Sequence, residues 1–493
     1  MSIKRTTKVT LKRELRLFDV TNLVVGAIIG ADIYVAAALG SSLIGPASLL
    51  AWVAAGLLAI LIALCFAYSS TLTPSLGGPY AYVKEAAGNL PGFMAGWSLL
   101  LAEWTSLAVF PVAFVRYFSF YFPDLGFWEQ TLLKAVFMSI IFITNLIGIR
   151  AAGKTNDVLT IGKLGPLFLF MVFGLLYMGV HSKESLSFFT PFLRGNWSDF
   201  GKVTVLVFWA YAGFELATIP ADEIENPRRT IPRAILVGMS IVVCFYLVTN
   251  FVINGVLSQE VLSHSTAPLA TAGAKVMSLI PHFGLIGGVL LWFGALISIT
   301  GADESGTVGT SRLAYAMAAD GLLPKVFCRL HPHFHTPYLN LGILSITAFV
   351  ASTIGTLTQL ISASVFFLSI AYLDTTLSLY ALEKKYQKMA TQLRLRHIIP
   401  GLGALASIFI ITQVGWHQIL TGILLLLTGT LIYFFYAPKQ RLHYVYQELF
   451  SREAVLRRTY RQTERFLAHP LHHIKRMIHR RKGIPPAWHV EEK

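Results

Sequence analysis

Two acidic residues stand inside long apolar stretches of the 493-residue chain. Asp32 ends the sequence GAIIGAD, Glu215 ends WAYAGFE, and small residues precede both. Glycine weakens a helix by about 1 kcal/mol relative to alanine and permits non-helical backbone. An opened helix presents N–H groups that favour anions and carbonyl groups that favour cations. We therefore expect two interrupted helices that bind a small zwitterionic or charged solute.

An alternative reading of the first stretch is structural. Gly26 and Gly30 form a GxxxG pattern, which commonly marks close packing between helices. The acid, and the matching small-residue stretch before Glu215, favour the functional interpretation. Two interrupted spans in corresponding places indicate a transporter built from inverted repeats, with the substrate held where the helices break.

Other ionisable residues in apolar segments are also candidates for function. Glu103 is expected to bind substrate or to form a polar contact between helices, and Lys163 either acts in the site or extends to the inner surface. Asp303 and Glu304 point about 100° apart on a helix. At most one of them should face the substrate, while the other meets a partner such as Lys163. The excess of acids favours a cationic substrate, although a neutral amino acid with proton coupling remains open.

The elements that position these residues are membrane helices. The chain is 55% hydrophobic and 13% charged, with a mean hydropathy of +0.61. About twelve apolar runs match the roughly 30 Å hydrocarbon core. The first begins near Leu17, and the others cover 46–71, 91–121, 131–149, 157–180, 200–221, 232–257, 283–317, 337–357, 359–383, 398–415 and 418–436. The sequence predicts an all-α polytopic membrane protein.

Enzyme and nucleic-acid functions are not indicated. The stretch GIRAAGKT, residues 148–155, fits the phosphate-loop pattern but joins two membrane helices instead of following a strand. The net charge of +15 is explained by basic residues in the loops of one side, which predicts that both termini are cytoplasmic. No cofactor is expected, and the three cysteines suggest no disulfide framework.

The chain divides into four predicted parts. A basic arm, 1–16, precedes a transport core, 17–384, followed by two further helices in 397–436 and a basic tail, 437–493. The tail is expected either to lie as amphipathic helices on membrane lipids of the anionic inner leaflet or to be a solvated basic segment. Its histidines lack the cysteine or carboxylate partners of a metal site, so no metal is expected. These histidines are His469, His472, His473 and His479.

Four stretches in order resemble the amino acid–polyamine–organocation (APC) superfamily of permeases. They are GAIIGADIY, TPSLGGPYAYVKEAAG from residue 73, FWAYAGFELATIPADEIENPRRTIPRAI from residue 208, and SRLAYAMAADGLLPKVF from residue 311. The resemblance implies a five-plus-five inverted repeat (LeuT-like) with broken helices 1 and 6 and two extra C-terminal helices. It also implies alternating-access transport of amino acids or related amines.

The resemblance further implies roles for individual residues. Trp209 or Tyr211 would act as an aromatic gate and Glu215 as a proton-sensitive latch. Lys163 would stand where sodium-coupled relatives bind sodium and would couple transport to protons. The positions expected to contact substrate are Ile29, Gly30, Ala31, Asp32, Trp209, Ala210 and Ala212.

Asp32 departs from the family pattern, which usually has glycine at this position. A carboxylate there would repel a substrate carboxylate and attract an ammonium. Burial could instead keep it protonated, or it could point into a polar network. The predicted function is secondary active transport at the cell membrane, proton-coupled or exchanging, with oligomeric state undetermined. The alternative is an amino-acid sensor with a transporter fold that signals through its tail.

Overall fold

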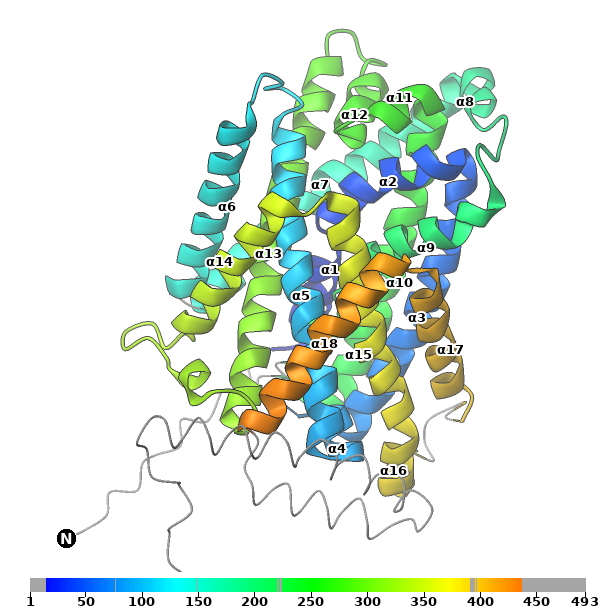
Figure 1. Ribbon diagram of the computed structural model, residues 1–493. Coiled ribbons are helices and arrows are strands. Elements are labelled where there is room, and N and C mark those ends of the chain that lie inside the picture. Colours follow the sequence, from blue (N-terminus) through cyan, green and yellow to red (C-terminus); the bar gives the residue numbers. More distant parts are fainter. Residues whose placement is uncertain are drawn as a thin grey trace, which may run out of the picture.

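The computed structural model describes residues 15–75, 77–147, 149–219, 221, 224–390, 395 and 397–436. The part of the chain it describes folds into a bundle of helices (Figure 1). The main helices are α1 (Leu17–Ile28), α2 (Ala31–Ile44), α3 (Ser48–Leu72), α4 (Pro79–Ala87), α5 (Asn89–Phe118), α6 (Phe127–Ile147), α7 (Ile149–Val180), α8 (Ser182–Phe188), α9 (Phe200–Phe208), α10 (Pro227–Val256), α11 (Gln259–His264), α12 (Pro268–Met277), α13 (Gly284–Ala319), α14 (Tyr338–Ile354), α15 (Leu357–Lys385), α16 (Gln387–Ala390), α17 (Ile399–Gln413) and α18 (Trp416–Tyr436). Short 3₁₀ helices are η1 (Gly45–Ala47), η2 (Trp197–Asp199), η3 (Trp209–Tyr211), η4 (Phe214–Thr218) and η6 (Lys325–Cys328).

The bundle has the character of a membrane protein. Among the described residues, nine segments are long and apolar enough to cross a membrane, and α1, α14 and α17 are shorter apolar helices. In the most apolar 18-residue stretch of each segment, the buried share is 83% for Trp197–Thr218 and 78% for α5. It is 22% for α6 and 17% for α18. The first two therefore form the centre, and α6 and α18 lie at the periphery, where their apolar side chains meet lipid.

The two predicted interruptions are present. α1 ends at Ile28 and α2 begins at Ala31, so the regular helix is lost over two residues. α9 ends at Phe208 and continues only as the short helices η3 and η4. The other predicted apolar ranges each coincide with a helix to within several residues. Residues 1–14 and the tail 437–493 lie outside the described residues, so the expectations for them stay predictions.

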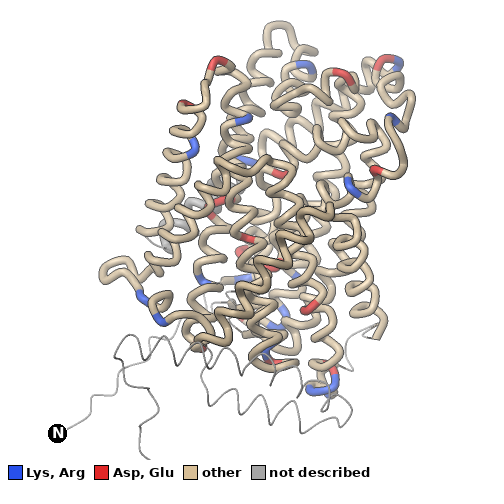
Figure 2. The backbone as a smooth tube through the Cα atoms, in the orientation of Figure 1, with Lys and Arg blue, Asp and Glu red and all other residues tan. Residues whose placement is uncertain are grey.

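Charged residues gather at the two ends of the bundle, and some acidic positions lie in its middle (Figure 2). At the end marked by α4 and α16, Lys84 of α4 and Tyr80 both bond Asp320, which follows α13. Arg16, just before α1, pairs with Glu225 at 3.5 Å. The first contacts join α4 to the end of α13, and the second joins the start of α1 to the segment before α10. We call this end of the bundle the α4 side.

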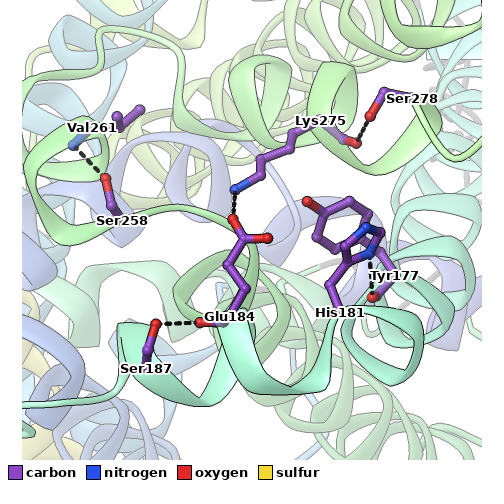
Figure 3. Close-up of polar contacts among 8 residues, drawn as sticks. All are labelled: Tyr177, His181, Glu184, Ser187, Ser258, Val261, Lys275 and Ser278. Carbon is purple, nitrogen blue, oxygen red and sulfur yellow. Dashed lines mark hydrogen bonds and ion pairs between the residues drawn. The ribbon is translucent and has the colours of Figure 1, made fainter.

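The opposite end carries α8, α11 and α12 (Figure 1). Here Lys275 of α12 donates to the carboxylate of Glu184 on α8 at 2.8 Å (Figure 3). The same ammonium lies 5.7 Å from the ring centre of Tyr177, on which His181 stacks. The hydrogen bond from Lys275 and the charge of this ammonium lower the pKa of Glu184. We call this face the α12 side.

A candidate substrate site between two interrupted helices

The first break is a close approach of backbone to a neighbouring helix. A side chain on Gly30 would place its Cβ 2.5 Å from the Cβ of Ala302 on α13. Carbon atoms at optimal contact are about 3.5–4.0 Å apart, so only glycine fits without movement. The backbone at Ile29 is extended, with φ −74° and ψ 95°, and Gly30 has φ −131° and ψ −136°. The helix therefore opens where α13 crosses it.

The carbonyl groups freed at the end of α1 are bonded by side chains of three other helices. Lys163 of α7 donates to the carbonyl of Gly26 at 2.5 Å, and Tyr246 of α10 donates to that of Ile28 at 3.0 Å. Ser298 of α13 lies 3.3 Å from the carbonyl oxygens of both residues in the break. Buried peptide groups need such partners. Side-chain hydrogen bonds thus stabilise the break in the folded protein.

The second break lies against the first. Gly213 has φ +119°, a conformation that favours glycine, and its Cβ position is 3.0 Å from the carbonyl carbon of Ala27. The preceding Ala212 is extended, with φ −72° and ψ 155°. Gly213 therefore packs against the last turn of α1, directly before the first opening, and both openings contain buried residues.

Glu215 is fully buried at the second break. Its two carboxylate oxygens accept from the N–H of Gly213 at 3.1 and 3.0 Å. Tyr372 of α15 donates to one of these oxygens at 2.8 Å. The carboxyl of Glu103, on α5, interacts with the same group. Two adjacent carboxyl groups cannot both ionise without large cost, so a proton or another cation belongs between them.

A cavity of about 30 Å³ lies where these elements meet. This volume holds about two water molecules, so a larger solute fits only after the surrounding helices separate. Among the described residues that line it, three carry carboxyl groups and none has a basic side chain. Those residues are Ala27, Asp32, Glu103, Ser106, Phe110, Trp209, Ala212, Gly213, Glu215, Leu216, Ala302, Gly306 and Leu368.

The structure brings some of the predicted site residues to this cavity and not others. Asp32, Trp209, Ala212, Glu215 and Glu103 line it. Outside the lining remain Ile29, Gly30, Ala31, Ala210, Tyr211, Lys163, Asp303 and Glu304. Ile29, Gly30 and Ala31 lie between the lining residues Ala27 and Asp32, Ala210 follows Trp209, and all four are buried at the breaks.

The two candidate aromatic gates have different surroundings. Trp209 donates its indole N–H to Ser106 at 3.1 Å, and its ring centre is 6.0 Å from that of Phe110, so it lies over the cavity. Tyr211 donates to the carbonyl of Trp52 at 3.0 Å and packs against the ring of that tryptophan. Of the two, Trp209 lines the cavity and Tyr211 does not.

The structure decides between the two readings of Lys163 and corrects the expected partner of the Asp303–Glu304 pair. Lys163 is fully buried and bonded to α1, so it does not extend to the surface. Its acidic partner is Asp32 and not a residue of the Asp303–Glu304 pair. Glu304 accepts from Thr144 of α6 at 2.7 Å, which places it on the side of α13 away from the cavity lining. Adjacent helix positions diverge, and here neither one reaches the cavity.

Sequence reasoning missed several lining residues. Ser106 and Phe110 follow Glu103 at spacings of three and seven, which places all three on one face of α5. This spacing could have identified them once Glu103 was considered part of the site. Ala302 and Gly306 share a face of α13 in the same way, whereas Leu368 carries no signal beyond being apolar.

Comparison with known proteins agrees with this arrangement. A family model described as "Amino acid permease" matches residues 15–450. The branched-chain amino acid permease BcaP of Bacillus subtilis is 26% identical over 453 residues, which cover 87% of this chain and 94% of the relative. The methylthioribose transporter of the same organism is 26% identical, and the match covers 88% of this chain and 95% of the relative. The serine/threonine exchanger SteT of Bacillus subtilis is 29% identical, and the match covers 81% of this chain and 91% of the relative. The chain therefore belongs to the amino acid permease family of the APC superfamily, whose members are membrane transporters and not enzymes.

Proposed function

We propose that the protein is a secondary active transporter of amino acids or related amines that works by alternating access around the two breaks. The observation that carries the proposal is that the second break packs against the last turn of α1, beside a small cavity lined by three carboxyl groups within a largely apolar bundle. Broken helices that meet at mid-membrane are typical of transporter binding sites. The fold we propose is the five-plus-five inverted repeat, with α1–α2 and α9–η4 as the first helix of each half and α17 and α18 as additions.

The charge of the cavity supports a preference for cationic substrates. Asp32, Glu103 and Glu215 line it, and the nearest lysine, Lys163, already interacts with the first of these. A carboxyl-rich site enclosed by apolar walls favours a positive solute and disfavours a negative one. Relatives named for branched-chain amino acids and for serine and threonine support neutral amino acids as the alternative.

Coupling to protons or exchange is part of the proposal. The carboxyl groups of Glu215 and Glu103 interact with each other, and such a pair needs a proton or a cation between its members. Lys163 of α7 donates to Gly26 near the end of α1. A change in the charge of one of these groups would change the strength of the interactions that stabilise the broken helices. Basic residues concentrated on the α4 side support an orientation in which this side, and both termini, are cytoplasmic. Examples are Lys84, Arg228, Arg229, Lys384 and Lys385.

Counterflow in proteoliposomes tests the function. Vesicles loaded with unlabelled amino acids or amines should accumulate at least one labelled counterpart, and a Trp209→Leu variant should lose this activity. Asp124→Asn, on the exposed loop between α5 and α6, is the matched control and should retain it. Truncation after residue 436 tests the sensor alternative, since a transporter continues to move substrate without its tail. Binding without flux for every solute tested would refute the proposal.

A further inference from the structure

Both helix breaks have an acidic residue two positions after the glycine: Gly30 is followed by Asp32, and Gly213 by Glu215. The N–H groups exposed by a broken helix form a natural binding place for an anion such as a substrate carboxylate. An acidic side chain so close to each break could itself occupy the N–H groups that a substrate carboxylate would otherwise bind.

At the first break the protein supplies the anion itself. A carboxylate oxygen of Asp32 lies 3.3 Å from the Cβ position of Gly30, so the side chain is folded back over the break. It faces the backbone N–H groups of Gly30 and of Asp32 itself. An acid in the first turn of α2 is also favoured by the helix dipole. Lys163 interacts with this carboxylate and bonds Gly26, so the opposite, carbonyl end of the break holds the chain's own ammonium.

At the second break the arrangement is repeated. The N–H of Gly213 is bonded by both oxygens of Glu215. A substrate carboxylate entering here would have to displace that side chain and would meet its charge, with Glu103 beside it. Like charges that are close together and poorly screened by water repel strongly. Both anion positions are thus occupied by residues of the chain.

The remaining groups of the cavity suit an ammonium. Glu103 and Glu215 offer adjacent carboxyl groups that need a proton or a cation between them. The aromatic rings of Trp209 and Phe110 form a further wall that attracts cations through their faces.

We propose that the transported solute is a primary amine without a carboxylate, and that Asp32 and Glu215 take the place of the substrate carboxylate at the two breaks. This inference rests on the proposed function and narrows its substrate class. The ammonium group of the amine would lie between Glu103 and Glu215 and replace the proton that this pair otherwise holds.

Matched pairs of ligands that differ only in the carboxylate test the proposal. The full-length protein is incubated with lysine and cadaverine, ornithine and putrescine, arginine and agmatine, or phenylalanine and phenethylamine, and binding is measured by calorimetry. In at least one pair the amine should bind about tenfold or more tightly than its amino acid, because the amino acid places a second carboxylate in the cavity. Tighter binding of the amino acid in the pair that binds best would overturn the proposal.

Two variants separate the charge of Asp32 from its occupancy of the break. Asp32→Gly opens the N–H groups and should move the preference toward the amino acid. Asp32→Asn keeps a side chain over the break but removes the charge, so it should show a smaller shift, and Asp124→Asn should show none. Thermal unfolding in detergent verifies that each variant is folded. An unchanged preference in a folded Asp32→Gly variant contradicts the assigned role.

The outcomes also distinguish this inference from the proposed function. Transport of an amino acid with exclusion of its amine leaves the transporter intact and refutes the substrate class. Absence of counterflow for both members of every pair counts against the proposed function and against the inference together.

Discussion

The packing of Gly30 against Ala302 gives a prediction whose size follows from one distance. In Gly30→Ala the new Cβ would stand 2.5 Å from the Cβ of Ala302, about 1–1.5 Å closer than two carbon atoms accept. α2 and α13 must therefore separate, or the break must change its backbone angles. Overpacking of this kind costs about 1–3 kcal/mol. We expect Gly30→Ala to lower the free energy of unfolding by that amount and to reduce transport.

The matching variant Ala302→Gly removes the methyl group that causes the clash. The double variant Gly30→Ala, Ala302→Gly should recover most of the lost stability, so the double-mutant cycle should show a coupling energy of about 1 kcal/mol or more. Unfolding is followed by titration with SDS in mixed micelles, and transport by counterflow. If the double variant is as unstable as the sum of the two single variants, the two positions are not in contact as described and the reasoning is refuted.

Other contacts give shorter predictions. Lys163→Met removes the donor to the buried carbonyl of Gly26 and should cost about 1–3 kcal/mol, seen as a lower unfolding midpoint; an unchanged midpoint would contradict this contact. Gly213→Ala forces a side chain into φ +119° and should cost about 1–3 kcal/mol in the same assay, whereas a stable variant would show that the break tolerates other backbone angles. The pKa of Glu184 is lowered by Lys275, so their ion pair stabilises the fold above the usual glutamate range and loses this effect as the pH falls through the lowered pKa. Because both side chains are partly exposed, Lys275→Gln should cost less than about 1 kcal/mol near neutral pH and nothing in acid, and an equal cost at both pH values would be inconsistent with this pair.

The fold was predictable from sequence to the level of its helices. Uniform apolar runs of membrane length identify spans whatever their neighbours are, because each helix satisfies its own backbone hydrogen bonds. The breaks were predictable as well, since glycine followed by an acid stands out in such a run. The resemblance to APC permeases, based on four stretches, is confirmed by the family match over residues 15–450.

The partners of the buried charges were not predictable in the same way. Lys163 was expected near Asp303 or Glu304, but it meets Asp32 and Gly26. Spacing along a helix gives the direction of a side chain relative to its own axis and does not give the rotation of that helix in the bundle. That rotation is decided by packing between distant segments, such as the close approach of α13 to the first break.

The charge in the closed cavity leads to a final prediction about the transport cycle. Two carboxylates held close together repel strongly where little water screens them, so Glu103 and Glu215, which interact with each other, resist closure unless a cation or a proton is present. With the proposed amine as substrate, a loaded carrier brings a cation, whereas a carrier that returns without substrate needs a proton instead. Net efflux should therefore become faster as the pH is lowered, and exchange, in which both crossings are loaded, should change much less.

Glu103→Gln tests this reasoning directly, because it removes one of the two charges while it keeps the size of the side chain. It should flatten the pH dependence of net efflux, and Asp124→Asn should leave that dependence as it is. Radiolabelled efflux from proteoliposomes, measured with and without substrate outside, separates the two modes. The same pH dependence in both modes would mean that closure of the cavity is not limited by its charge, and the link between the carboxyl pair and the cycle would have to be abandoned.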